Sequence, residues 1–244
     1  MTVNIGLARS YGRSATEKRP TKVTRGFIEN AAGSCLIETG ATKVLCAVTI
    51  EERVKPWRKG SGLGWVTAEY AMLPASTNKR SARERGNRNG RSMEIERLIG
   101  RSLRTAVDMS ALGGEVTFNV DCDVLQADGG TRTASITGAW IALHDAIEHW
   151  RACGKISGNP LLTQVAAISV GQVDGRVLLD LDYQEDSRAE VDLNLIMNGN
   201  GEIIELQGTG EKLAFGRDKL NRMLDVAEAG IEELLQIQRE VCGE

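Results

Sequence analysis

The chain has 244 residues, of which 41% are hydrophobic and only 4% aromatic, so it can form one large domain or two small ones around an aliphatic core. Its net charge of −3 hides an asymmetry: residues 1–104 carry 20 basic and 9 acidic groups, whereas residues 105–244 carry 10 and 24, which predicts a polyanionic partner for the basic region. No segment approaches the ~18 consecutive apolar residues of a membrane helix, and residues 1–20 contain no apolar stretch of signal-peptide length, so neither a membrane protein nor an exported one is expected.

The N-terminal part of the chain predicts a sheet followed by a helix. Segments rich in Val, Ile, Leu and Thr predict strands over residues 23–29, 34–38, 42–51 and 64–73. Residues 76–89 are polar and charged without an apolar period, which is typical of an exposed loop. A helix is predicted over residues 93–109, where apolar side chains recur at every third or fourth position.

The C-terminal part repeats this order of strands and then helix. The predicted elements are a strand over 115–125, a helix over 133–153, a hairpin of 165–172 with 176–183 across Asp174-Gly175, a hairpin of 190–198 with 202–207, and a helix over 218–240. Because strands and helices do not alternate regularly, we expect an α+β fold rather than a doubly wound sheet. The sequence predicts one compact domain over residues 1–244, built from two similar halves of β-sheet plus helix. Residues 1–18 form an N-terminal extension, which could be mobile, or a first strand.

The cysteines and histidines indicate no redox or nucleophilic chemistry. The five cysteines are odd in number and contain no Cys-x-x-Cys pair, so neither a disulfide framework nor a structural zinc site is expected. His144 and His149 are five positions apart, off one helical face, and no Ser, Cys or His arrangement suggests a covalent nucleophile. Reduced, buried cysteines predict a cytoplasmic location.

A glycine-rich turn precedes the helix of the second part. Gly129 and Gly130 allow the backbone to turn sharply and to present its N–H groups at the positive end of the helix dipole. With the Thr131 hydroxyl and the Arg132 charge, these groups favour an anion. The Lys-Ser/Thr ending of a nucleoside-triphosphate P-loop is missing, so ATP binding is not indicated. An ordinary turn capped by Thr is the alternative that the spacing leaves open.

Arginines gather before and at the start of the first predicted helix. Arg91 stands at the helix entrance, from which it could reach the same anion. The preceding loop carries Arg80, Arg83, Arg85 and Arg88, and such a basic loop suits a phosphodiester backbone, which is bound through charge. Solvated arginines without a ligand are the alternative.

Carboxylates cluster over residues 180–192. In extended strands Asp180 and Asp182 would share one face, and so would Glu190 and Asp192, with Asp186 in the connection. Packing so many acids together costs free energy unless a cation or an arginine answers them. The cluster therefore predicts a site for a hard cation such as Mg²⁺, which takes one or two carboxylates. An acidic hairpin edge that discourages aggregation is the alternative.

Four motifs closely resemble the bacterial ribonuclease PH family. They are residues 64–74 (GWVTAEYAMLP), 94–101 (EIERLIGR), 121–138 (DCDVLQADGGTRTASITG) and 183–187 (YQEDS), the last followed by AEVD over 189–192. The similarity extends from about residue 19 to residue 237. It implies the ribosomal-protein-S5-domain-2-like α+β fold of that family, with duplicated halves.

The resemblance also implies an activity and an assembly. The expected enzyme is a phosphate-dependent 3′→5′ exoribonuclease, a nucleotidyltransferase that trims tRNA precursors, with rRNA as a further substrate. It would release nucleoside diphosphates reversibly and form a homo-hexamer built as a trimer of dimers. Two rival functions stay open: a catalytically silent RNA-binding ring subunit, and a hydrolytic metal-dependent exonuclease of the same fold.

The family's functional positions are present in this sequence. Its phosphate contacts fall on Arg91, Gly130, Thr131 and Arg132. Its catalytic, metal-associated aspartates fall on Asp186 and Asp192, and either could instead act as a general acid. Of three arginines linked to tRNA binding, two match Arg80 and Arg83, while the third is replaced by Ala75; Arg85 and Arg88 could compensate.

Overall fold

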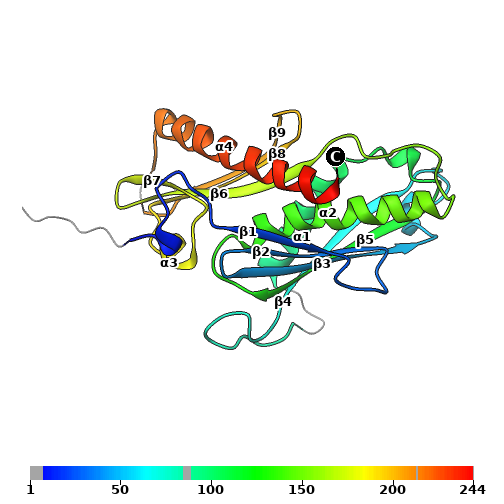
Figure 1. The fold of residues 1–244 in the computed structure, drawn as a ribbon, viewed down its shortest axis with the longest axis horizontal. Coiled ribbons are helices and arrows are strands. Elements are labelled where there is room, and N and C mark those ends of the chain that lie inside the picture. Colours follow the sequence, from blue (N-terminus) through cyan, green and yellow to red (C-terminus); the bar gives the residue numbers. More distant parts are fainter. Residues whose placement is uncertain (1–7, 85–88, 213, 244) are drawn as a thin grey trace, which may run out of the picture.

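Two β-sheets and a long buried helix between them make up the structure, a computed structural model that describes residues 8–84, 89–212 and 214–243 (Figure 1). The first sheet has the strand order β1-β2-β3-β5-β4. Its strands are β1 (Thr21–Arg25), β2 (Gly33–Thr39), β3 (Thr42–Glu51), β4 (Trp65–Met72) and β5 (Thr117–Gln126). The parallel pair β4–β5 needs a crossover, which α1 (Gly90–Thr105) supplies.

The second sheet is antiparallel, with the order β7-β6-β8-β9. Its strands are β6 (Val165–Val173), β7 (Arg176–Leu179), β8 (Val191–Asn198) and β9 (Ile203–Gly210). Both predicted hairpins are present, although the first extends only to Leu179. Asp174 and Gly175 have φ values of 50° and 75°, the left-handed conformations that a two-residue hairpin turn requires.

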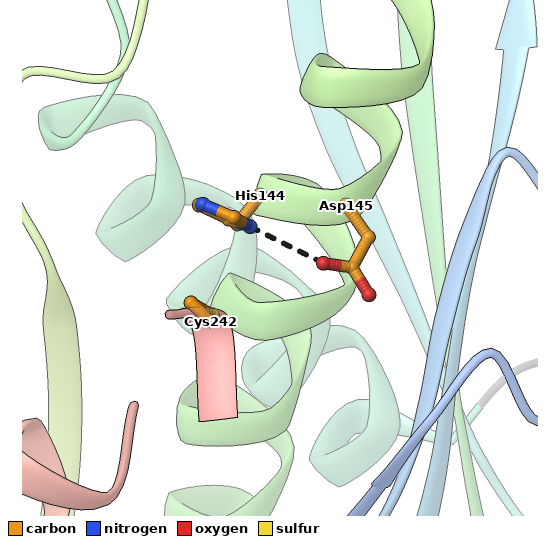
Figure 2. Close-up of side chains that lie close together, drawn as sticks. All are labelled: His144, Asp145 and Cys242. Atoms are coloured by element: carbon orange, nitrogen blue, oxygen red, sulfur yellow. Dashed lines mark hydrogen bonds and ion pairs between the residues drawn. The ribbon is translucent and has the colours of Figure 1, made fainter. Parts of the chain in front are cut away.

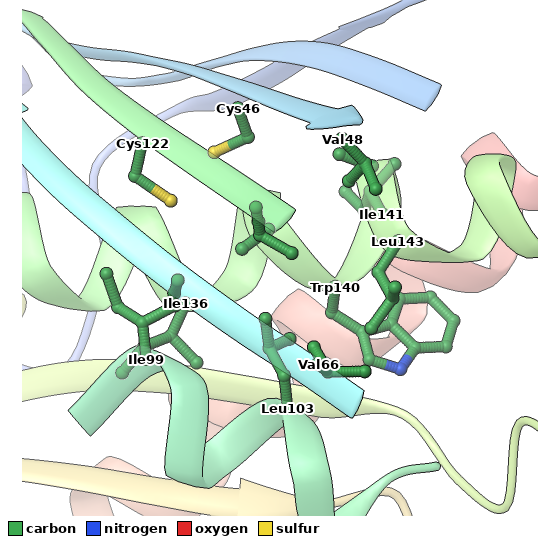
Figure 3. Packing of buried hydrophobic residues seen from close by; sticks show 14 of the residues in the cluster. Cys46, Val48, Val66, Ile99, Leu103, Cys122, Ile136, Trp140, Ile141 and Leu143 are labelled. Atoms are coloured by element: carbon green, nitrogen blue, oxygen red, sulfur yellow. The ribbon is translucent and has the colours of Figure 1, made fainter. Parts of the chain in front are cut away.

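The helix α2 (Thr131–Ala152) joins the two halves through one core. It packs against β2 and β3 on one side of the molecule and against β6 of the second sheet. Trp140 and its neighbours lie fully buried there (Figure 3), and the same cluster includes Val165 and Ala167 of β6. The helix α4 (Arg217–Cys242) also packs against β6, which is buried at all nine positions. The predicted α+β fold of two sheet-plus-helix halves is confirmed.

One predicted strand is wrong in its second half. The segment over 176–183 leaves the sheet at Leu179, because Asp180 adopts a left-handed backbone with φ 53°. A short helix, α3 (Tyr183–Asp186), follows. It starts with a capping box, in which the Asp182 side chain accepts from the Glu185 amide at 2.9 Å and the Glu185 side chain accepts from the Asp182 amide at 3.1 Å. Asp180 and Asp182 therefore do not share a strand face.

The segment before the first sheet runs to the second half of the molecule. It contains a short 3₁₀ helix, Ser10–Gly12, and the first strand begins at Thr21. Arg9 and Arg13 in this segment donate to backbone carbonyls of Leu179 and Asp180. None of the helices in the described residues is both long and apolar enough to cross a membrane.

Candidate active site

An open cleft of about 1100 Å³ is lined by both halves of the molecule. The first half contributes the start of α1 and the turn into α2, and the second half contributes α3, β8 and β9. All six residues singled out for phosphate and metal line this cleft: Arg91, Gly130, Thr131, Arg132, Asp186 and Asp192. The fold therefore brings the glycine-rich turn and two of the acids, more than fifty positions apart in sequence, into one site.

Side-chain contacts fix the turn that precedes α2, and the N-cap residue provides no side chain to bind the first amides of this helix. Gly130 is the N-cap, with φ 63°, and it brings no side chain to cap the helix. Thr42 fixes the preceding residues, because its hydroxyl donates to the Gly129 carbonyl at 2.7 Å and accepts from the Asp128 amide at 2.9 Å. A Cβ at Gly129 would stand 2.8 Å from the Asp182 carbonyl carbon, so only glycine allows the two halves to approach here. The result is an uncapped helix N-terminus, which favours an anion.

Arg132, in the first turn of α2, is oriented by two side chains from distant elements. Its Nη1 donates to Gln207 Oε1 of β9 at 2.8 Å and lies 3.5 Å from Glu94 Oε1 of α1. Gln207 Nε2 in turn donates to Glu94 Oε1 at 2.9 Å. The glutamine thus links the arginine to the acid that balances its charge. Sequence reasoning did not single out Gln207, and no local pattern distinguishes it.

Tyr70 is a second residue that the sequence analysis missed. Its buried hydroxyl lies 2.9 Å from Thr131 Oγ1 and fixes that hydroxyl at the helix entrance. Burial raises the pKa of Tyr70, so the phenol stays neutral, although the nearby charges of Arg91 and Arg132 oppose the shift. The motif over residues 64–74 carried this tyrosine, but its role depends on the fold placing β4 beside α2.

The surroundings of the two cleft aspartates, Asp186 and Asp192, disfavour the charged form of each side chain. Burial, reinforced by the charge of Asp186, raises the pKa of Asp192 to about 6, while Arg132 opposes the shift. Loss of hydration in the cleft also raises the pKa of Asp186, although its side chain remains exposed, and Arg91 and Arg132 oppose this. The Asn194 amide donates to Asp192 Oδ2 at 3.4 Å. Two carboxylates that repel each other, and whose oxygens still have lone pairs free to donate, suit a hard divalent cation.

Asp180, Asp182 and Glu185 have arginine partners, and Glu190 accepts instead from the Gln172 side chain. The prediction that residues 180–192 act together as a cation site is therefore wrong for these four acids. Arg19, fully buried, binds Asp180 with Nη2 to Oδ1 at 2.6 Å and Nε to Oδ2 at 2.9 Å. Arg9 Nε lies 2.7 Å from Glu185 Oε1, and Arg13 lies near both carboxylates. The Arg19 pair lowers the pKa of Asp180 against the opposing effect of burial. Arg19 also donates to the Asp128 carbonyl, so this pair supports the glycine-rich turn that precedes α2.

The basic loop is only partly described. Arg80 and Arg83 are exposed, whereas Arg85 and Arg88 lie outside the described residues. The charge of Arg83 opposes the burial that raises the pKa of Asp123 on β5. Glu84 accepts from the Ser92 hydroxyl at 2.8 Å, which ties this end of the loop to the first turn of α1. The loop therefore adjoins the helix that carries Arg91.

Comparison with known proteins places these features in one family. A model described as "3' exoribonuclease family, domain 1" matches residues 17–147, and one described as "3' exoribonuclease family, domain 2" matches residues 163–230. The chain is 56% identical to ribonuclease PH of Corynebacterium glutamicum (strain R) over 245 residues, covering 100% of each chain. It is also 56% identical to ribonuclease PH of Mycobacterium bovis (strain BCG / Pasteur 1173P2) over 238 residues, covering 96% of this chain and 92% of the relative.

Solved structures share the fold at low identity. An Archaeoglobus fulgidus exosome with RNA bound to its active site aligns with a TM-score of 0.80 at 22% identity, covering 94% of this chain and 92% of the other. Rice (Oryza sativa) Rrp46 aligns with a TM-score of 0.76 at 20% identity, covering 95% and 98%. At this identity the likeness establishes the architecture.

Proposed function

The chain belongs to the 3′ exoribonuclease family of ribonuclease PH, and we propose that its cleft binds the inorganic phosphate that cleaves the RNA. The activity is that of a phosphorolytic 3′→5′ exoribonuclease, a nucleotidyl transfer to phosphate. One observation carries the proposal: the uncapped N-terminus of α2 lines the same cleft as Asp186 and Asp192, two carboxylates without an ion-pair partner among the described residues.

The attacking phosphate would be held by groups of the first half. The amides at the start of α2, the Thr131 hydroxyl and the guanidinium groups of Arg91 and Arg132 offer hydrogen bonds and positive charge to its oxygens. Arg132 is preorganised by Gln207, and Thr131 by Tyr70, so little freedom is lost when the phosphate binds. Phosphoryl transfer depends mainly on such positioning and charge stabilisation.

In the reaction, an oxygen of the bound phosphate attacks the phosphorus of the terminal phosphodiester. The bond from that phosphorus to the 3′ oxygen of the preceding nucleotide breaks, so the products are a nucleoside diphosphate and an RNA one residue shorter. The reverse reaction extends RNA from nucleoside diphosphates. No protein nucleophile is required in this reaction, because the bound phosphate supplies the attacking oxygen.

Asp186 and Asp192 fit a Mg²⁺ ion. Both are hard oxygen donors, and their mutual repulsion would be relieved by a divalent cation. When bound, the ion would neutralise charge on the scissile phosphate and on the leaving 3′ oxygen. Asn194 would keep Asp192 oriented through its amide.

The RNA would be a tRNA precursor, and rRNA in addition, processed in the cytoplasm. Arg80 and Arg83 are exposed beside α1 and would bind the phosphodiester backbone without reading its sequence.

We also propose a homo-hexamer arranged as a trimer of dimers. The edge strand β9 exposes 53% of Ile203 and 39% of Leu206, as an assembly surface would, and relatives of this fold form exosome cores. Light scattering of the purified chain would measure the assembly.

Product analysis tests the function directly. A tRNA with a 3′ tail is incubated with the enzyme and Mg²⁺, with or without inorganic phosphate. Nucleoside diphosphates should form only when phosphate is present. Nucleoside monophosphates in phosphate-free buffer would identify a hydrolytic nuclease instead. RNA binding without any product would identify a silent subunit.

A further inference from the structure

The end of α4 brings a cysteine to a histidine and an aspartate on α2. His144 is buried, while Asp145 and Cys242 are half-buried, and one ligand atom from each lies within 4.8 Å of the other two. Figure 2 shows the imidazole and the carboxylate in contact, with His144 Nδ1 3.2 Å from Asp145 Oδ1, and Cys242 beside them at the end of α4. One nitrogen, one oxygen and one sulfur thus converge.

These separations are close to those of a tetrahedral zinc site. Bonds of ~2.0–2.3 Å to nitrogen, oxygen and sulfur place the ligand atoms roughly 3.3–3.6 Å from one another. The histidine–aspartate pair is already at this spacing. The cysteine needs to approach by about 1.5 Å at most, and it lies in the last turn of a C-terminal helix, where such movement is easy.

Arg25, the last residue of β1, holds the carboxylate in place. Its Nε lies 3.1 Å from Asp145 Oδ1 and 3.0 Å from Oδ2, and its Nη2 also donates to Oδ1. Its Nη1 donates to the Val241 carbonyl, next to Cys242. A carboxylate has about four acceptor sites, so it can accept from the arginine and still coordinate a metal. Outer hydrogen bonds of this kind orient metal ligands. Gly33 allows the strand to approach, because a Cβ there would lie 2.9 Å from the Asp145 Cβ.

We propose that His144, Asp145 and Cys242 bind a zinc(II) ion, with water as the fourth ligand, and that this ion fastens the end of α4 to α2. Sulfur and imidazole ligands favour zinc over Mg²⁺. The site is separate from the cleft, because Asp145 lies 14 residues along α2 from Thr131, or about 20 Å. Sequence spacing could not reveal it, since Cys242 is distant along the chain and no Cys-x-x-Cys is present.

Cobalt(II) tests the proposal in the untagged, full-length chain. Cobalt replaces zinc in tetrahedral sites, and a thiolate ligand gives it a charge-transfer absorption in the near ultraviolet. The wild-type chain should develop this band with one cobalt per chain, and zinc should abolish it. Cys242→Ser should remove the band, and both Cys242→Ser and His144→Gln should weaken cobalt binding at this site by more than about 100-fold, beyond the loss typical of an outer partner.

Cys153, the residue that follows the last turn of α2, supplies a matched control. Its sulfur lies 3.7 Å from His149 Nε2, and the pair belongs to no group of three metal-ligating side chains within the described part of the chain. Cys153→Ser should leave the band unchanged. Asp192→Asn should also leave it unchanged while it slows phosphorolysis, so this test is independent of the proposed function. Absence of the band in the wild type, its persistence in Cys242→Ser, or full affinity in His144→Gln would overturn the proposal.

Discussion

The carboxylates between Asp180 and Asp192 fall into two groups with opposite surroundings. Asp180 and Glu185 are buried against arginines of the N-terminal segment, and each has an ion pair shorter than 3 Å. Asp186 and Asp192 line the cleft, and neither has an ion-pair partner among the described residues. The first group has a folding role, whereas the second keeps its oxygens available for a ligand.

The two groups of acids meet at the consecutive residues Glu185 and Asp186. They are consecutive residues of α3, but Glu185 turns back to cap the helix and to bind Arg9, while Asp186 reaches the cleft. Successive helical positions point about 100° apart, so one short helix can serve both groups. A run of acids in a sequence therefore does not define a site. The site is defined by the acids that the fold leaves without a charged partner.

The largest expected effect concerns the buried group. Asp180→Asn should lower the free energy of unfolding by about 3–5 kcal/mol, because it leaves Arg19 buried without its counter-charge. Asparagine tolerates the left-handed backbone at this position, so the change isolates the charge from backbone strain. Urea denaturation followed by circular dichroism measures it. Glu51→Gln, which breaks the exposed pair with Arg53, is the control and should change stability little. An equal effect of both substitutions would contradict the distinction.

Acid should affect the wild type and this variant differently. The pKa of Asp180 is lowered in the folded state, so its stabilising contribution is complete above the unfolded pKa of about 3.9 and is lost as the pH falls further. The stability difference between wild type and Asp180→Asn should thus be constant from pH 7 to about pH 5, and it should shrink below about pH 4. A difference that shrinks near neutral pH would assign the effect to another group.

The cleft group should show the reverse pattern. Asp192→Asn should reduce turnover by about 10²–10³-fold, because it removes a charge that acts on the transferring phosphoryl group. Its thermal midpoint should stay the same or rise, since the substitution relieves burial of a charge and repulsion from Asp186. Nucleoside diphosphate release and a thermal melt measure the two quantities. Near-normal turnover would remove Asp192 from the site.

The arginines can be compared in the same way. Arg132→Ala should lower kcat/KM for phosphate by about 10- to 100-fold, the value of one or two charge-assisted hydrogen bonds, and should change RNA affinity far less. Initial rates at varied phosphate and RNA binding without phosphate separate these effects. Equal losses in both would argue against a contact with the attacking phosphate.

The smallest effect is expected at the exposed arginines. Arg80→Ala should weaken RNA binding uniformly across sequences and reduce the steepness of its salt dependence by about 0.7, the value of one phosphate contact on a single strand. Binding measured at several salt concentrations would detect this. Arg222→Ala on α4, also exposed, is the control and should leave the slope unchanged.

Local patterns predicted most of the fold, and the family motifs picked out residues that line one cleft. The strand over 42–51, the Asp174-Gly175 turn and the glycine-rich entrance to α2 all depend on neighbours in sequence, and the structure has each of them. The strand over 176–183 was extended too far, although the Asp182–Glu185 capping box was visible as a signal. Gln207 carried no local signal, and the motif that contains Tyr70 did not reveal its role, because each side chain acts on a residue that only the fold brings near.

The sequence by itself determined the order of strands and helices and the residue types that line the cleft, because these follow from hydrophobic period, turn chemistry and motif. Only the tertiary structure decided which charges neutralise one another. Arg19 meets Asp180 across 161 positions of sequence, and this pairing removes one acid from the cluster while it supports the turn that faces the cleft. Electrostatic energy depends on distance and burial in space, and neither can be obtained from positions along the chain.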